Sequence, residues 1–209
     1  MMFTWLLIGI AALLGYATGR YRVHQFQNQG EVRVRQAIQQ ACSGDYWHLL
    51  NNVTLPTADG TTQIDHVLVS RYGVFVIETK DYQGWIFGDA HRKQWTQVLY
   101  RKKYPFQNPL HQNYKHINAV ASALDFLPSE HIRGAVIFVG SAEFKTARPE
   151  GVFNLPEFIA FLHRQDTEVM TQNRMQFCVG RLECLRLALT KATDVEHRTR
   201  LQQRFGELS

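Results

Sequence analysis

Two apolar segments on either side of a short turn constrain the fold of this chain most. Residues 63–70 and 74–80 are rich in β-branched and aromatic side chains, and an Arg-Tyr-Gly tripeptide separates them. This pattern predicts a β-hairpin. Four consecutive apolar residues, Val74–Ile77, indicate that its second strand is covered on both faces. That strand nevertheless ends in two charged residues, Glu78 and Lys80.

The length of the turn decides where these charges point. If the turn has two or four residues, Asp65 on the first strand lies opposite Glu78, and Lys80 shares their face of the sheet. A three-residue turn with Gly73 as a bulge would shift the pairing and separate them. The sequence leaves this choice open.

A cluster of this kind suits phosphodiester hydrolysis, which needs a nucleophile at neutral pH and a stabilised anionic transition state. Mg²⁺, or Mn²⁺ in its place, provides both and takes one or two carboxylates as ligands. Asp65, Glu78 and the Thr79 carbonyl would be its ligands, and Lys80 would position and deprotonate the attacking water or shield the developing charge. The alternative is an ordinary surface ion pair.

The remaining periodicity predicts a single mixed α/β domain. A helix over residues 24–42 carries Glu31 on its apolar face, where a carboxylate is costly unless it is paired. Asn108 is predicted to cap a further helix that extends to about Leu127. The other predicted strands are 46–55, 85–88, 94–100 and 134–140, and the other predicted helices are one from about 156, then 169–191 and 194–205.

The first residues form a separate hydrophobic segment. Residues 2–19 contain no charged side chain, and Arg20 and Arg22 follow them. This predicts an uncleaved, single-pass transmembrane helix with the soluble part facing the cytoplasm. A cleaved signal peptide and a soluble helix are the alternatives. We expect residues 20–29 to form a juxtamembrane helix or linker.

Charge and cysteine content exclude little. A formal net charge of +5 mildly favours a polyanionic or anionic-membrane partner. The three cysteines indicate neither a disulfide framework nor a zinc module. No carboxylate stands at ligand spacing with His111 and His116, so we expect no zinc there. His66 points away from Asp65 in regular β geometry and is expected to be structural.

Basic residues suggest two further surfaces. Arg101, Lys102 and Lys103 alternate with aromatic residues in a stretch predicted to be a solvated loop, and with Lys115 they are candidate nucleic-acid contacts. The last predicted helices also carry several basic residues that suit either solvent or a membrane-scaffolding role. They are Arg181, Arg186, Lys191, Arg198, Arg200 and Arg204.

The central segment resembles the nuclease-related domain (NERD) family, a branch of the PD-(D/E)xK nuclease superfamily. The resemblance rests on Gly30-Glu31, residues 62–88, Trp95 and residues 108–113. It implies a restriction-endonuclease-like mixed β-sheet flanked by helices.

The same resemblance implies roles for individual residues. Asp65 and Glu78 would be the metal-binding acids and Lys80 the catalytic lysine. Glu31 would be a helical glutamate that approaches the site, and Gln112 a polar residue lining the active centre.

We therefore expect a nuclease-like core at residues 30–145 and a C-terminal helical extension at 146–209 packed on it. The leading hypothesis is a membrane-anchored, divalent-metal-dependent nuclease that acts on DNA, with RNA as a further candidate substrate. The alternative is a catalytically inactive module of the same fold that binds nucleic acid or a protein partner at the membrane. The residues do not indicate an oligomeric state.

Overall fold

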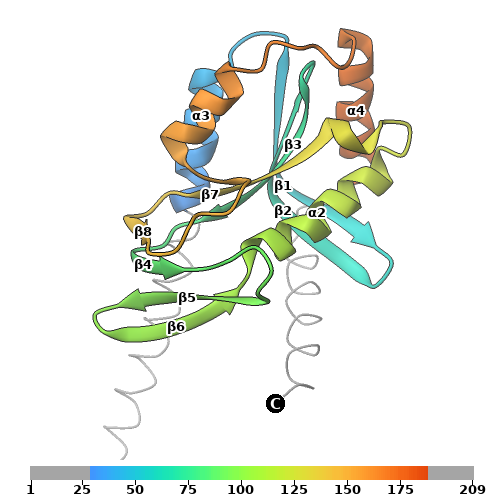
Figure 1. Cartoon of the computed structure of the whole chain (residues 1–209). Helices are drawn as coiled ribbons and strands as arrows, with labels where there is room; N and C mark the ends of the chain where they lie inside the picture. The colour runs from blue at the N-terminus through green and yellow to red at the C-terminus, as the bar shows by residue number, and fades with distance from the viewer. Residues whose placement is uncertain (1–28, 188–209) are drawn as a thin grey trace, which may run out of the picture.

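A five-stranded mixed sheet forms the centre of the molecule (Figure 1). The computed structural model describes residues 29–187. Within them the sheet has the order β1-β2-β3-β7-β9, with β1 to β3 antiparallel and β3, β7 and β9 parallel. Its strands are β1 (Trp47–Thr57), β2 (Gly60–Ser70), β3 (Gly73–Lys80), β7 (Ile132–Phe138) and β9 (Val152–Asn154).

Helices cover both faces of this sheet, which explains the continuous apolar run of β3. One face packs against α2 (Pro109–Ala123) and α4 (Gln172–Leu185) through residues such as Val76, Val120 and Leu182. The other face packs against the helix of residues 29–41 and α3 (Leu155–His163). These two helices lie side by side in Figure 1. The prediction of an α/β arrangement with a mixed sheet flanked by helices is thus confirmed.

The β2–β3 hairpin has a two-residue turn, with Ser70 paired to Gly73 and the ladder continuing to His66 and Ile77. The register in which Asp65 faces Glu78 is therefore the correct one. Gly73 adopts φ 128°, a conformation that favours glycine. It is nevertheless paired with Ser70 in the ladder, so it does not form the β-bulge that would have shifted the register.

A second, four-stranded sheet has the order β6-β5-β4-β8. Its strands are β4 (Gly84–Phe87), β5 (Gln94–Leu99), β6 (Lys102–Gln107) and β8 (Ala142–Phe144). The prediction of a solvated loop after residue 99 was wrong, because β5 and β6 form a hairpin through a turn at Tyr100 and Arg101. β6 escaped detection because it is an exposed edge strand, where charges and a proline, Pro105, are tolerated.

Several element boundaries also differ from the predictions. α2 ends at Ala123 and α4 begins at Gln172, and a 3₁₀ turn (Ser129–His131) precedes β7. β8 and β9 have three residues each, too short for periodicity to reveal. Within residues 29–187 no helix is long and apolar enough to cross a membrane. The predicted anchor at 2–19, residues 20–28 of the predicted linker and the helix at 194–205 lie outside the described residues.

Candidate active site

The polar cluster lies where β2 and β3 separate at the end of β3. The backbone ladder stops at His66 and Ile77, and the Thr79 N–H instead donates to Asp65 Oδ2 at 2.7 Å. The Asp65 carboxylate therefore accepts a bond that a backbone carbonyl accepts elsewhere in the ladder. The β1–β2 ladder is also interrupted beside Asp65, where Asn52 adopts φ 51°. Such local distortion of strands is common next to functional sites.

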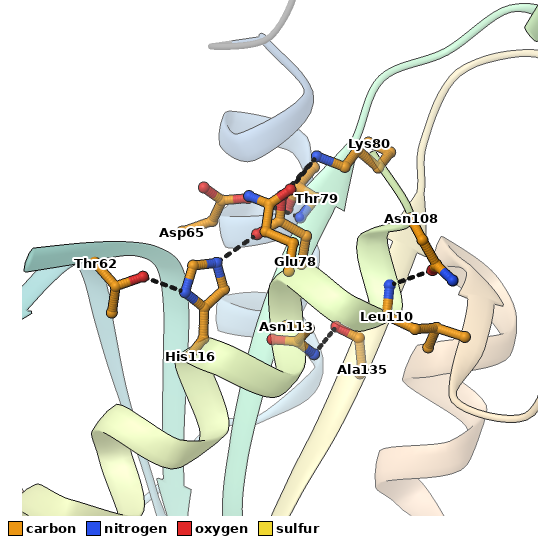
Figure 2. A network of polar contacts seen from close by, with 11 residues as sticks. Thr62, Asp65, Glu78, Thr79, Lys80, Asn108, Leu110, Asn113, His116 and Ala135 are labelled. Carbon is orange, nitrogen blue, oxygen red and sulfur yellow. Dashed lines mark hydrogen bonds and ion pairs between the residues drawn. The ribbon is translucent and has the colours of Figure 1, made fainter. Parts of the chain in front are cut away.

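Glu78 is held from two sides, as Figure 2 shows. Lys80 Nζ donates to Glu78 Oε1 at 2.7 Å, and His116 Nε2 lies 3.1 Å from Glu78 Oε2. The other ring nitrogen of His116 lies 2.8 Å from Thr62 Oγ1. Glu78 is only 2% exposed, so both carboxylate oxygens are satisfied by protein groups rather than by water.

Helix α2 supplies the other wall of the site. Lys80 Nζ also donates to Gln112 Oε1 at 3.1 Å, so this lysine bridges β3 and α2. Asn113 fixes the helix on the sheet, because its Nδ2 donates to the carbonyls of Val76 on β3 and Ala135 on β7. A Cβ on Gly134 would lie 2.6 Å from Ile117 Cδ1 and 2.9 Å from Asn113 Nδ2, so α2 packs closely on the sheet at this glycine.

Asn108 confirms the predicted start of α2 and also links this helix to the β4–β5 loop. Its side-chain oxygen accepts the Leu110 N–H, as an N-cap does. Its Nδ2 lies within hydrogen-bond distance of three backbone carbonyls in the β4–β5 loop: those of Asp89, Ala90 and Arg92. One buried asparagine therefore joins the helix that carries Gln112 to the smaller sheet.

Glu31 approaches the cluster from the opposite side of the sheet. A Cβ on the preceding residue, Gly30, would lie 2.8 Å from Asp81 Cβ, so glycine allows the helix of residues 29–41 to pack against the end of β3. Burial raises the pKa of Glu31, and the charge of Glu78 raises it further, while Lys80 partly offsets both. Glu31 is therefore electrostatically part of the same cluster as Glu78 and Lys80.

The three charged groups on β2 and β3 differ in electrostatic environment. Burial, followed by the negative charges of Glu78 and Glu31, raises the pKa of Asp65 well above its ordinary value. Burial alone would raise the pKa of Glu78, but Lys80 and His116 outweigh it and the net shift is downward. Burial alone would lower the pKa of Lys80, but the Glu78 carboxylate outweighs it and the net shift is upward. Glu78 and Lys80 therefore form a charged pair beside a carboxyl group that resists ionisation.

The donor set fits a hard divalent cation. Three carboxylates, those of Glu31, Asp65 and Glu78, lie near a single lysine, and burial together with the charges of Glu78 and Glu31 raises the pKa of Asp65. Among residues 29–187, no three His, Cys, Asp or Glu side chains are arranged to hold a metal by themselves. Mg²⁺ commonly takes only one or two carboxylates and completes its shell with waters and substrate oxygens.

The predicted site residues thus fall into two groups. Glu31, Asp65, Glu78, Lys80 and Gln112 are brought together, and Thr79 contacts Asp65 through its N–H. The candidate nucleic-acid residues lie elsewhere: Arg101, Lys102 and Lys103 are exposed on the β5–β6 hairpin, and Lys115 is exposed on α2.

The histidines illustrate what sequence reasoning missed. His66 lies on the opposite face from Asp65, as expected, and its Nδ1 is 2.8 Å from Asn51 Oδ1. Burial, with a contribution from Arg35, lowers the pKa of His66 to about 4. His116 is instead part of the cluster. The available signal was its position four residues after Gln112, which places both side chains on one face of α2.

Comparison with known proteins identifies a family for this chain. Residues 27–139 match the family described as nuclease-related domain. The chain belongs to the nuclease-related domain family. The matched segment contains the five clustered residues and ends just after β7, so the family domain includes the three central strands and α2.

A relative from Bacillus anthracis, described as an uncharacterized protein, is 41% identical over 121 residues. The match spans 57% of this chain and 57% of the relative, so a large part of each protein lies outside it.

Proposed function

We propose that this nuclease-related domain is a divalent-metal-dependent nuclease that hydrolyses phosphodiester bonds in nucleic acid, with DNA as the expected substrate. The observation that carries the proposal is the buried Glu78–Lys80 pair next to Asp65, at the point where two central strands separate. Burying two acids and a lysine together costs free energy, and in phosphodiester hydrolysis each of Asp65, Glu78 and Lys80 would have a catalytic role.

Each side chain has a role that its contacts support. Asp65 and Glu78, with the Thr79 carbonyl, would hold Mg²⁺ or Mn²⁺. When bound, such a cation supplies Lewis-acid stabilisation and a water of lowered pKa. Lys80 has a raised pKa, which favours a charged ammonium that shields the developing negative charge over a neutral general base. Gln112 orients Lys80, and His116 fixes the second oxygen of Glu78.

Membrane attachment is a separate part of the proposal. Residues 2–19 would anchor the domain in a membrane and leave it facing the cytoplasm, and this rests on the sequence pattern alone.

A cleavage assay tests the proposed activity. The full-length chain in detergent is incubated with linear, branched and single-stranded nucleic acids in Mg²⁺, in Mn²⁺ or in EDTA. We expect cleavage only with metal, and a fall of roughly 10²–10³-fold for Lys80→Met. Asp125→Asn, a change at an exposed carboxylate, is the matched control. Equal rates for Lys80→Met and the parent would refute the proposed activity.

Thermal unfolding tests the metal site independently of turnover. At ten times its Kd, Mg²⁺ should stabilise the parent by about 1.4 kcal/mol, a few degrees in Tm. Asp65→Asn should abolish this response, because an amide is a weaker ligand than a carboxylate. The same variant should be roughly 0.5–2 kcal/mol more stable than the parent without metal, because it removes a carboxylate whose ionisation Glu78 and Glu31 oppose.

One observation favours a second candidate, a non-catalytic module that binds nucleic acid or a protein partner. Both oxygens of Glu78 already accept bonds from protein groups, as they would in a closed structural network. That candidate predicts nucleic-acid or partner binding with no turnover, and no stabilisation of the parent by Mg²⁺.

A further inference from the structure

The smaller sheet has one buried face and one exposed face, and they differ in chemistry. The buried face carries Ile86, Trp95 and Phe144, which pack with Phe138 of β7. Strand alternation turns Trp85 and Phe87 to the opposite side, where they are 49% and 38% exposed. Two large aromatic side chains that are this exposed and lie side by side on one strand are typical of an interaction surface.

Strand register shows which residues surround these two rings. Val98 of β5 lies opposite Trp85, and Lys103 of β6 lies opposite Val98. In the next row, Thr96 lies opposite Phe87. Opposed residues share a face, so a continuous surface extends from the two rings across β5 to the edge strand β6. We call it the outer face, made of Trp85, Phe87, Thr96, Val98, Lys103, Pro105 and Glu143, the last of which lies opposite Trp85 on β8.

The charge around the outer face is mainly positive. Lys145 Nζ lies 5.0 Å from the centre of the Trp85 ring, a cation–π contact. The strands of the smaller sheet, the β5–β6 turn and residue 145 together carry one carboxylate, that of Glu143. They carry four cations: Lys103 on the outer face, Lys145 over the Trp85 ring and paired with Glu143, Arg101 in the turn, and Lys102, which alternates to the opposite face.

We infer that the outer face binds single-stranded nucleic acid, with bases stacked on Trp85 and Phe87 and phosphates contacted by the lysines. This inference rests on the proposed nuclease function and specifies its substrate class. Open aromatic rings accept unpaired bases, whereas the bases of a duplex are already stacked on one another. The two rings are about 6.6 Å apart along the strand, so they receive different bases.

The position of the outer face suits a strand that also reaches the candidate active site. Lys80 ends β3, and β4 begins at Gly84, so three residues separate the proposed catalytic lysine from the aromatic strand. Figure 1 shows β4, β5 and β6 on one side of the molecule and α4 on the distant side. Phe177, the exposed aromatic residue of α4, is therefore a suitable control.

Binding of fluorescently labelled oligonucleotides to the full-length chain in detergent and EDTA tests the inference without turnover. We expect the single strand to bind more tightly than the duplex, and Trp85→Ala to weaken single-strand binding roughly 10-fold to 100-fold. Trp85→Phe should retain most of the affinity, because it keeps an aromatic ring. Phe177→Ala, at a 60% exposed position on α4, should leave the affinity unchanged.

Tryptophan emission reports on the same surface directly. The difference in emission between the parent and Trp85→Phe isolates the signal of Trp85. Quenching of this signal by the single strand, and less by the duplex, supports the inference. Equal quenching by both, or none, overturns it. A blue shift with phosphatidylserine–phosphatidylcholine vesicles and no response to oligonucleotide also overturns it and assigns the outer face to lipid.

The test separates this inference from the proposed function. If the parent cleaves nucleic acid but Trp85→Ala binds and cleaves a single strand normally, the nuclease proposal stands and the inference fails. If Trp85-dependent binding is present and metal-dependent cleavage is absent, the outer face binds a single strand and the nuclease proposal fails.

Discussion

The same short motif, Glu-x-Lys, occurs at the ends of two strands of this molecule, and the two copies differ in burial and in the groups around them. Glu78 pairs with Lys80 at the end of β3, and Glu143 pairs with Lys145 just after β8. The side chains of the first pair are 3% and 14% exposed, and those of the second are 62% and 33% exposed. The motif alone therefore does not define a site.

The position of each strand in its sheet accounts for the difference. β3 lies between β2 and β7 in a sheet covered by helices on both faces, so Glu78 is buried and Lys80 is largely shielded from water. β8 pairs with β4 at the margin of the smaller sheet, where water reaches the pair. Water screens the exposed charges, whereas the buried charges interact with each other and with Asp65 and Glu31 at lower effective dielectric.

The largest expected difference between the two pairs is in stability when the lysine is removed. Lys80→Met should lower the free energy of unfolding by about 3–5 kcal/mol, because it leaves clustered carboxylates without their cation. Lys145→Met should change it by less than about 1 kcal/mol. Urea unfolding of the full-length variants in EDTA measures both. A loss below 1 kcal/mol for Lys80→Met would mean that burial does not distinguish the two pairs.

An intermediate effect on stability is expected from His116, which contacts the Glu78 carboxylate of the buried pair. His116→Leu should cost about 1–3 kcal/mol, because the buried Glu78 Oε2 loses its donor. His111→Leu is the matched control on the same helix, since its Nε2 lies 3.1 Å from the Ala90 carbonyl in an exposed contact. In the double variant with Glu78→Gln, the two losses should be less than additive. Full additivity would show that His116 and Glu78 act independently.

The smallest effect is expected at the exposed acid. Glu143→Gln should change the free energy of unfolding by less than about 1 kcal/mol, and the change should vanish in high salt as the charges are screened. Thermal unfolding at low and high salt measures this. A large, salt-resistant loss would show that the exposed pair is as strongly coupled as the buried one.

The sequence alone predicted the hairpin well, because apolar alternation and turn residues are local signals. It left the register open, and the two-residue turn between Ser70 and Gly73 decided that Asp65 faces Glu78. Edge strand β6 was missed, since an exposed strand with lysines and a proline lacks the apolar pattern that identifies strands. His116 was missed as a member of the cluster, because its partner Glu78 lies 38 residues away.

Local physics therefore determined the longer elements, the cap at Asn108 and the apolar character of β3, since each depends on neighbours within a few residues. The tertiary structure decided which charges are buried together, because burial depends on how strands and helices far apart in sequence pack. Gly30 and Gly134 carry no charge and bind nothing, yet their lack of a side chain allows two helices to approach the end and the face of the sheet. That approach gathers Glu31, Gln112 and His116 around the acids and lysine of the hairpin.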